Sequence, residues 1–163
     1  MDYRIRPITK TEYPLLDDFL YEAIFIPEGV QAPPRDIIRQ PELQVYVADF
    51  GKRAGDMGFV AETENQIVGA VWVRIMNDYG HIADDTPSFA ISLYPDYRNQ
   101  GIGKALMRAM LGALRQAGYR QASLAVQKRN YAVKMYMHLG FTIIDENEEE
   151  YIMLYRFYTD DDA

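Results

Sequence analysis

Two glycines, at positions 101 and 103, lie where a strand-like segment gives way to a helical one. The segment reads Tyr94-Pro95-Asp96-Tyr97-Arg98-Asn99-Gln100-Gly101-Ile102-Gly103-Lys104. The first N–H groups of a helix lack partners within the helix, and the helix dipole adds partial positive charge at that end. Glycine lets an anion approach the main chain closely, and Arg98 and Lys104 add positive charge. The segment therefore predicts a loop that binds a diphosphate.

Two better-known glycine motifs do not fit this loop. A dinucleotide fingerprint needs a third glycine, or an alanine, at the position that Leu106 occupies. A Walker loop needs glycine at position 98 and Ser or Thr at position 105, where the chain has Arg98 and Ala105. An ordinary helix start that happens to contain glycine remains an alternative for the isolated motif.

A second segment downstream makes the first one more specific. It reads Asn130-Tyr131-Ala132-Val133-Lys134-Met135-Tyr136 and continues into Leu139-Gly140-Phe141. Together with Arg98-x-x-Gly101-x-Gly103, it resembles the signatures of the GNAT acetyltransferases. The strand-like Ala90-Ile91-Ser92-Leu93-Tyr94-Pro95 also resembles that family's pattern. The motifs span residues 89–141, and the expected order of elements agrees with the family from residue 4 to residue 156.

The resemblance implies that the chain binds acetyl-coenzyme A. In this family the pantetheine arm lies between two splayed strands, here Phe89–Leu93 and Gln121–Val126, and bonds their main chain as an added strand would. Main-chain N–H groups from Asn99 to Lys104 would hold the pyrophosphate, and an N–H near Leu93 would face the thioester carbonyl. The residues expected to contact acetyl-CoA are Ile91, Leu93, Arg98, Asn99, Gln100, Gly101, Ile102, Gly103, Lys104, Asn130 and Tyr136.

Tyr136 is the residue expected to act chemically. A phenol has an ordinary pKa of about 10, so it is protonated at neutral pH and could protonate a departing thiolate. The alternative is a tyrosine that only packs beside Val133 and Leu139 on its helix. The role of Asn130 also has alternatives. It could bond the pantetheine arm, cap the helix that begins at Tyr131, or do both.

The base that would deprotonate the acceptor amine is not identified by any motif. Five acidic or basic side chains lie near segments that could face the cleft, and water is a further candidate. These side chains are Glu62, Glu64, His81, Asp84 and Asp85. The acidic run 145–150 could attract a cationic acceptor, or could only keep a hairpin tip hydrated.

Several elements must position these groups. Residues 4–8 read as a strand, a helix follows with Leu16, Phe19 and Leu20 at helical spacing, and residues 58–73 read as a hairpin. Residues 41–50 are ambiguous between helix and strand, and we favour a helix. The segment 21–31 occupies the region that forms the acceptor-side lid in the resembling family.

A long helix over residues 101–117 follows the diphosphate loop. Its predicted buried face consists of Ile102, Leu106, Met110, Ala113 and Ala117. A strand on each side of this helix predicts a parallel pair, because a strand–helix–strand crossover places its strands parallel. With the resemblance, the fold class is a single-domain α/β GNAT-like fold. Its sheet is mixed and mostly antiparallel, of six to seven strands with a splayed parallel pair and helices on both faces. The domain is expected to span residues 1–158, with a frayed tail at 159–163.

Composition narrows the function further. The 163 residues carry a formal net charge of -7 with no long basic run, which disfavours nucleic-acid binding. No apolar run approaches the length of a membrane span, and the N-terminus lacks a signal-peptide core. There is no cysteine and there are two histidines, so neither a thiolate nucleophile nor a metal site is predicted. The chain is expected to be cytoplasmic, as a monomer or a homodimer.

The predicted function is transfer of acetyl from acetyl-CoA to a primary amine of a small molecule or peptide. The absence of cysteine favours direct transfer in a ternary complex. A non-catalytic acetyl-CoA sensor is the alternative, since it would need the loop but not the phenol. A nucleotide-binding domain without preference for CoA is a third interpretation, if the match at 130–141 is accidental.

Overall fold

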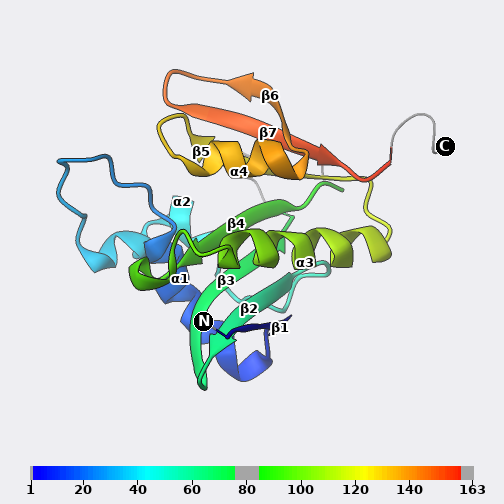
Figure 1. Cartoon of the computed structure of the whole chain (residues 1–163), viewed down its shortest axis with the longest axis horizontal. Helices are drawn as coiled ribbons and strands as arrows, with labels where there is room; N and C mark the ends of the chain where they lie inside the picture. Colours follow the sequence, from blue (N-terminus) through cyan, green and yellow to red (C-terminus); the bar gives the residue numbers. More distant parts are fainter. Residues whose placement is uncertain (1, 76–84, 159–163) are drawn as a thin grey trace.

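A single sheet of seven strands organises the part of the chain that the structure describes (Figure 1). The computed structural model describes residues 2–75 and 85–158. The strands are β1 (Arg4–Pro7), β2 (Met57–Thr63), β3 (Gln66–Arg74), β4 (Ser88–Leu93), β5 (Gln121–Gln127), β6 (Thr142–Glu146) and β7 (Glu150–Arg156). Their order is β1-β2-β3-β4-β5-β7-β6, and β4 with β5 is the one parallel pair in the described chain. This confirms the predicted mixed, mostly antiparallel sheet.

Helices cover both faces of the sheet (Figure 1). The α-helices are α1 (Leu16–Glu22), α2 (Pro41–Gln44), α3 (Ile102–Gln116) and α4 (Ala132–Leu139). Three 3-10 helices accompany them, η1 (Lys10–Leu15), η2 (Arg35–Arg39) and η3 (Pro95–Tyr97). The helix favoured for residues 41–50 forms over its first four residues only, and turns follow it.

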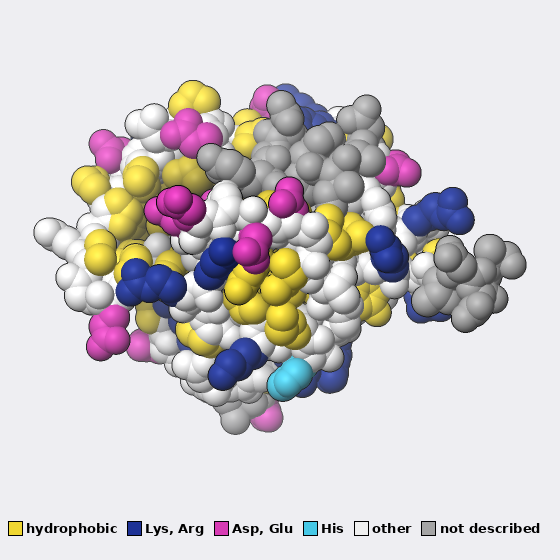
Figure 2. All heavy atoms as spheres, turned by 90° about the horizontal axis from the view of Figure 1, so that it is seen from above, with side chains coloured by type: hydrophobic (Ala, Val, Ile, Leu, Met, Phe, Trp, Pro, Cys, Tyr) yellow, Lys and Arg dark blue, Asp and Glu magenta, His cyan; other side chains and the backbone are white. Residues whose placement is uncertain are grey.

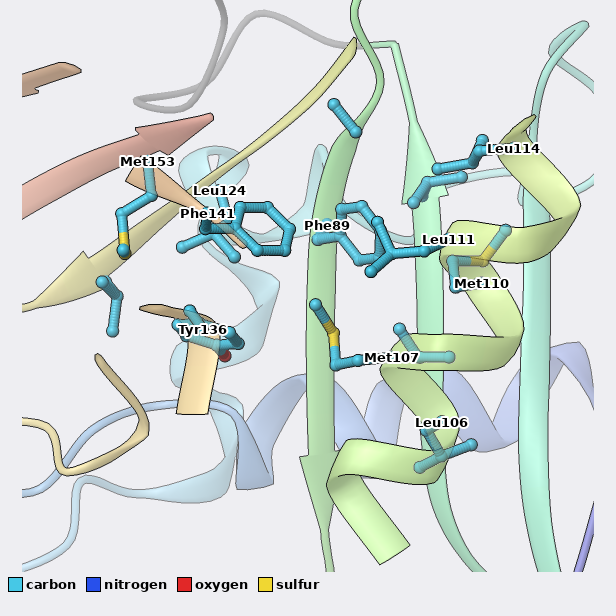
Figure 3. Close-up of a cluster of buried hydrophobic side chains, with 14 of the residues drawn as sticks. Phe89, Leu106, Met107, Met110, Leu111, Leu114, Leu124, Tyr136, Phe141 and Met153 are labelled. Atoms are coloured by element: carbon cyan, nitrogen blue, oxygen red, sulfur yellow. The ribbon is translucent and has the colours of Figure 1, made fainter. Parts of the chain in front are cut away.

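Two hydrophobic cores result, one on each face. Successive side chains of β3 enter opposite cores, with Val71 and Val73 on the α3 face and Ala70 and Trp72 on the α1 face. The first core joins α3 and α4 to the sheet, and Figure 3 shows its side chains converging from the two helices and the strands between them. The site therefore rests on a framework packed from both sides.

The buried face of α3 is wider than predicted. Ile102, Leu106 and Met110 are buried as expected, whereas Ala117 is exposed. Three further side chains are buried, Met107, Leu111 and Leu114. Because α3 lies across β2, β3 and β4, it buries side chains over a wider part of its circumference than predicted.

The parallel pair separates after a single point of contact. Ser88 pairs with Ser123, and the Ser123 N–H donates to the Pro87 carbonyl at 2.9 Å. No other register pair joins β4 to β5 within the described chain. Figure 3 shows the green ribbon of β4 and the yellow ribbon of β5 diverging from there. The predicted splayed pair is therefore present, and it opens toward the C-terminal end of β4.

A buried ion pair fixes the far end of β3 to the α1 side. Arg74 and Asp56 are 0% and 1% exposed, and the guanidinium bonds both carboxylate oxygens, at 3.1 and 2.8 Å. Its remaining nitrogen donates to the carbonyls of Val45 and Ala48 at 3.0 and 2.8 Å. This network holds residues 45–56 against the sheet.

Candidate active site

The loop between β4 and α3 presents its main chain in a form suited to an anion. After η3, Asn99 has φ 62° and Gly101 has φ 85°, both in the left-handed region. Asparagine tolerates this region better than most residues, and glycine adopts it freely. Alternation between left-handed and other conformations turns neighbouring N–H groups toward a common concavity, which is how backbone nests bind anions. Gly101 then becomes the N-cap of α3.

Packing within the protein does not require glycine at position 103. A Cβ built there would meet the Leu93 Cδ1 at 3.7 Å and the Met135 Sδ at 3.9 Å, both ordinary van der Waals distances. Glycine in a helix costs up to about 1 kcal/mol relative to alanine. Its effect here is to leave the main chain bare at the surface of the cavity, where a ligand could approach it.

The two predicted cationic side chains of the loop lie in different settings. Lys104 lines the cavity described below. Arg98 also lines it, but its guanidinium is engaged within the protein. It donates to the Leu93 carbonyl at 3.0 Å and to the Glu22 carbonyl and carboxylate at 3.3 Å each. Arg98 therefore ties the loop to the ends of β4 and α1.

Gln100 and Ile102 do not direct their side chains into the cavity. The Gln100 amide donates to the Asp96 carbonyl at 2.9 Å. The Ile102 side chain is 1% exposed and belongs to the core beneath α3. Neither residue lines the cavity described below, and the contacts predicted for them stay predictions.

The edge of β4 offers main-chain groups to the open side. The Tyr94 N–H donates to the Val68 carbonyl at 3.0 Å, so in the antiparallel ladder the even-numbered residues of β4 face β3. Ile91 and Leu93 therefore direct their N–H and C=O groups toward β5, from which β4 has separated. The Leu93 carbonyl is taken by Arg98. The groups of Ile91 and the N–H of Leu93 face the gap where an extended ligand could pair.

Tyr136 reaches the same gap from α4. It is 7% exposed and packs edge-on against Phe141, with ring centroids 5.9 Å apart. Figure 3 labels both side chains within the first core. Burial raises the pKa of the Tyr136 phenol above its ordinary value of 10, and the nearby Tyr131 adds to the rise. Within the described chain the hydroxyl has no hydrogen-bond partner. A buried hydroxyl without a protein partner is unusual, and this one is available to bond a group bound in the cavity.

Asn130 acts on α4 as a cap. Its side-chain oxygen accepts from the Ala132 N–H at 2.9 Å. Asn130 also lines the cavity. The capping interpretation is confirmed, and contact with pantetheine stays a prediction.

These groups surround one cavity of about 710 Å³. Its walls come from the end of α1 and the segment after it, from β4, from the diphosphate loop and from α4. The lining residues are Tyr21, Glu22, Ala23, Ile24, Phe25, Ile26, Ala32, Ile91, Ser92, Leu93, Pro95, Arg98, Asn99, Gly101, Gly103, Lys104, Asn130, Tyr131, Ala132, Met135, Tyr136 and His138. Nine of the predicted contact residues thus share this cavity.

The three predicted candidates for the base that the structure describes do not line this cavity. Glu62, Glu64 and Asp85 are absent from its walls. Glu62 is instead held by Arg4 at 3.0 Å and Arg6 at 3.2 Å, which lowers the pKa of its carboxyl. His81 and Asp84 lie outside the described residues.

The acidic run 145–150 also lies away from the cavity walls, in β6, the following turn and the start of β7. Figure 2 shows acidic, basic and hydrophobic side chains intermingled on the face seen from above. Within the described chain, no three His, Cys, Asp or Glu side chains are grouped to hold a metal ion. No helix there is long and apolar enough to cross a membrane.

Glu22 is a charged lining residue that sequence reasoning did not single out. It is the only acidic side chain among the described residues of the cavity wall, and it pairs with Arg98 at 3.3 Å. Its place at the end of α1, within the segment 21–31 predicted as the acceptor-side lid, was the available signal. No motif singled it out.

Comparison with known proteins places this architecture among acetyltransferases. The model of the Acetyltransferase (GNAT) family matches residues 19–141. Human N-acetyltransferase 8B is 29% identical over 107 residues, covering 65% of this chain and 47% of that protein. Mycothiol acetyltransferase of Thermobispora bispora is 34% identical over 86 residues, covering 52% of this chain and 29% of that protein. The chain thus spans less than half the length of these relatives.

Solved structures agree in fold at low sequence identity. The PaiA N-acetyltransferase from Thermoplasma acidophilum, in complex with coenzyme A, has a TM-score of 0.71 at 18% identity, covering 96% of this chain and 100% of that one. The putative acetyltransferase yncA from Salmonella typhimurium, with its cofactor acetyl-CoA, has a TM-score of 0.68 at 14% identity, covering 96% and 94%.

Proposed function

The chain belongs to the acetyltransferase (GNAT) family, and we propose that it transfers acetyl from acetyl-CoA to a primary amine. The acceptor is a small molecule or a peptide, and transfer is direct within a ternary complex. One observation carries the proposal. A single cavity joins the loop with left-handed Asn99 and Gly101, the open edge of β4 and a buried phenol that has no hydrogen-bond partner among the described residues.

The loop and the strand edge fit a CoA thioester. The N–H groups from Asn99 to Lys104 hold the pyrophosphate, aided by the positive end of α3 and by the Lys104 ammonium. The free main-chain groups of Ile91 pair with the pantetheine amides, in the way that a peptide adds to a sheet edge. Asn130 reaches the same arm while it caps α4.

The reacting end of the thioester lies near Leu93 and Tyr136. The Leu93 N–H points into the gap and stabilises the negative charge that develops on the carbonyl oxygen. The neutral amine nitrogen bonds to the carbonyl carbon, the C–S bond breaks, and the Tyr136 hydroxyl gives its proton to the sulfur. The nitrogen loses a proton to water as the amide forms, and Tyr136 regains its proton from water. Burial keeps this phenol neutral and likewise disfavours an unprotonated CoA thiolate, so the proton passes from the Tyr136 oxygen to the CoA sulfur.

An acetyl-CoA sensor without catalysis is the second candidate. It is favoured by one observation, that Glu62, Glu64 and Asp85 all lie off the cavity wall. If none of the predicted side chains acts as the base, water takes the amine proton during transfer, whereas a sensor needs no base. The cytoplasmic location and the monomeric or homodimeric state stay predictions.

A panel of primary amines with acetyl-CoA tests the proposal. Free CoA should appear faster with at least one amine than by hydrolysis alone, together with an equal amount of acetylated amine. Initial rates should depend on both substrates as a ternary complex requires. Label exchange between acetyl-CoA and free CoA without amine would instead indicate a covalent acetyl-enzyme.

A further inference from the structure

The cavity has a wall that the donor does not need. It is formed by the end of α1 and the segment that follows, across from β4 and α4. Its members are Tyr21, Glu22, Ala23, Ile24, Phe25, Ile26 and Ala32. We refer to these residues as the α1 wall. Apart from Glu22, every side chain of this wall is apolar or aromatic.

The one tyrosine of the α1 wall does not make it polar. The Tyr21 hydroxyl donates to the Pro33 carbonyl at 2.6 Å, so its polar end is already satisfied. The Arg35 guanidinium lies 5.4 Å from the Tyr21 ring centre and pairs with Asp18. These contacts hold both ends of the connection between α1 and η2.

The middle of the connection also has a defined shape. The Val30 N–H donates to the Pro27 carbonyl at 3.1 Å, and Gly29 has φ 82°. This turn follows directly after Ile24, Phe25 and Ile26. The apolar surface is therefore presented by a folded segment rather than by an open chain.

Glu22 marks the charged end of the wall, close to the proposed reaction centre. The Arg98 guanidinium that bonds its carboxylate at 3.3 Å also bonds the Leu93 carbonyl at 3.0 Å. A single side chain thus links this carboxylate to the residue proposed to hold the thioester carbonyl. An ammonium held at Glu22 lies near the thioester carbon, which its nitrogen attacks after it has lost a proton to water. The α1 wall offers no second anion.

We infer that the acceptor is a monoamine with a compact apolar body, its amino group at Glu22 and its body on Ile24, Phe25 and Ile26. The inference rests on the proposed acetyl transfer and names its substrate class. It excludes polyamines, because their second ammonium would be buried against apolar side chains without a partner.

A series of straight-chain amines tests the inference, because these amines differ in apolar length and hardly in basicity. From ethylamine through propylamine to butylamine, kcat/KM should rise about fourfold for each added methylene buried on the wall. With 1,4-diaminobutane, kcat/KM should fall at least tenfold below that with butylamine.

Two variants test whether the dependence on amine length comes from the α1 wall or from any exposed residue of the same connection. Phe25→Ala should reduce the increase in kcat/KM to less than twofold per methylene. Val30→Ala should retain the fourfold increase, because Val30 lies in the same connection but away from the cavity and is 56% exposed. Calorimetric affinity for acetyl-CoA within twofold of the native value would establish that Phe25→Ala is folded.

The outcomes distinguish failure of the inferred acceptor class from failure of the proposed acetyl transfer. A flat series, or a preference for 1,4-diaminobutane, with CoA still released would overturn the inference and leave acetyl transfer intact. No release with any amine would remove the proposed function, and the inference with it.

Discussion

Gly101→Ala tests the diphosphate loop, because the same helix offers a matched control. Gly101 has φ 85° at the start of α3, and Gly118 has φ 89° just beyond its end. A Cβ at either position meets nothing within 4 Å. The cost of alanine is therefore conformational at both sites, about 1–2 kcal/mol for a left-handed L-residue. For a chain of this size, that lowers Tm by about 2–8 °C.

The two variants should differ in ligand binding. Gly101→Ala strains the main chain that presents N–H groups to the pyrophosphate, so the acetyl-CoA dissociation constant should rise at least tenfold, equivalent to about 1.4 kcal/mol. Gly118→Ala carries the same strain far from the loop and should bind as the native chain does. Calorimetric titration with acetyl-CoA, beside thermal unfolding of each variant, measures both effects.

Two results would refute the reasoning. Native affinity in folded Gly101→Ala would mean that the loop does not hold the pyrophosphate. Equal weakening in both variants would trace the effect to general destabilisation instead.

Four further predictions follow from particular side chains. Tyr136→Phe should lower kcat by about 10²–10⁴ with little change in KM for acetyl-CoA, and thermal unfolding should show no loss of stability because the hydroxyl has no protein partner in the described chain. Because burial raises the pKa of Tyr136, its ionisation moves to higher pH, and the pH–rate profile should show no descending limb from this group below its ordinary pKa of 10. Glu12→Gln should lower the free energy of unfolding by about 1–2 kcal/mol at neutral pH. The hydrogen bond from Arg6 lowers the pKa of Glu12 from 4.5 to about 2. The difference in unfolding free energy between the native chain and the variant should therefore disappear as the pH falls between those two values. Arg74→Met leaves the Asp56 carboxylate buried without its partner and should cost about 3–5 kcal/mol in urea unfolding.

The sequence predicted the part of the site that local rules determine. Glycine spacing, the strand before it and the helix after it all act over a few residues, and the structure has a loop between β4 and α3 where they place it. Its binding of a diphosphate stays a prediction. The parallel pair followed from the crossover rule. Nine of the predicted contact residues line one cavity, because they lie on the two segments that carry the family resemblance.

Long-range contacts account for what was missed. Glu22 enters the site through an ion pair with Arg98, 76 residues away, which no local pattern encodes. Glu62 looked available on its hairpin, but the pairing of β1 with β2 brings Arg4 and Arg6 to it. The predicted buried face of α3 omitted Met107, Leu111 and Leu114, because the width of the sheet beneath the helix depends on tertiary structure.

The most direct test of the central claim follows the acetyl group itself. Acetyl-CoA carrying an isotopic label in its acetyl carbons is incubated with the chain and an amine such as butylamine, and both products are measured by mass spectrometry. The account predicts labelled N-acetyl amine and free CoA in equal amounts, with both strongly reduced in Tyr136→Phe. Tight binding of acetyl-CoA with no labelled amine from any acceptor would contradict it and leave the chain as a sensor of the thioester.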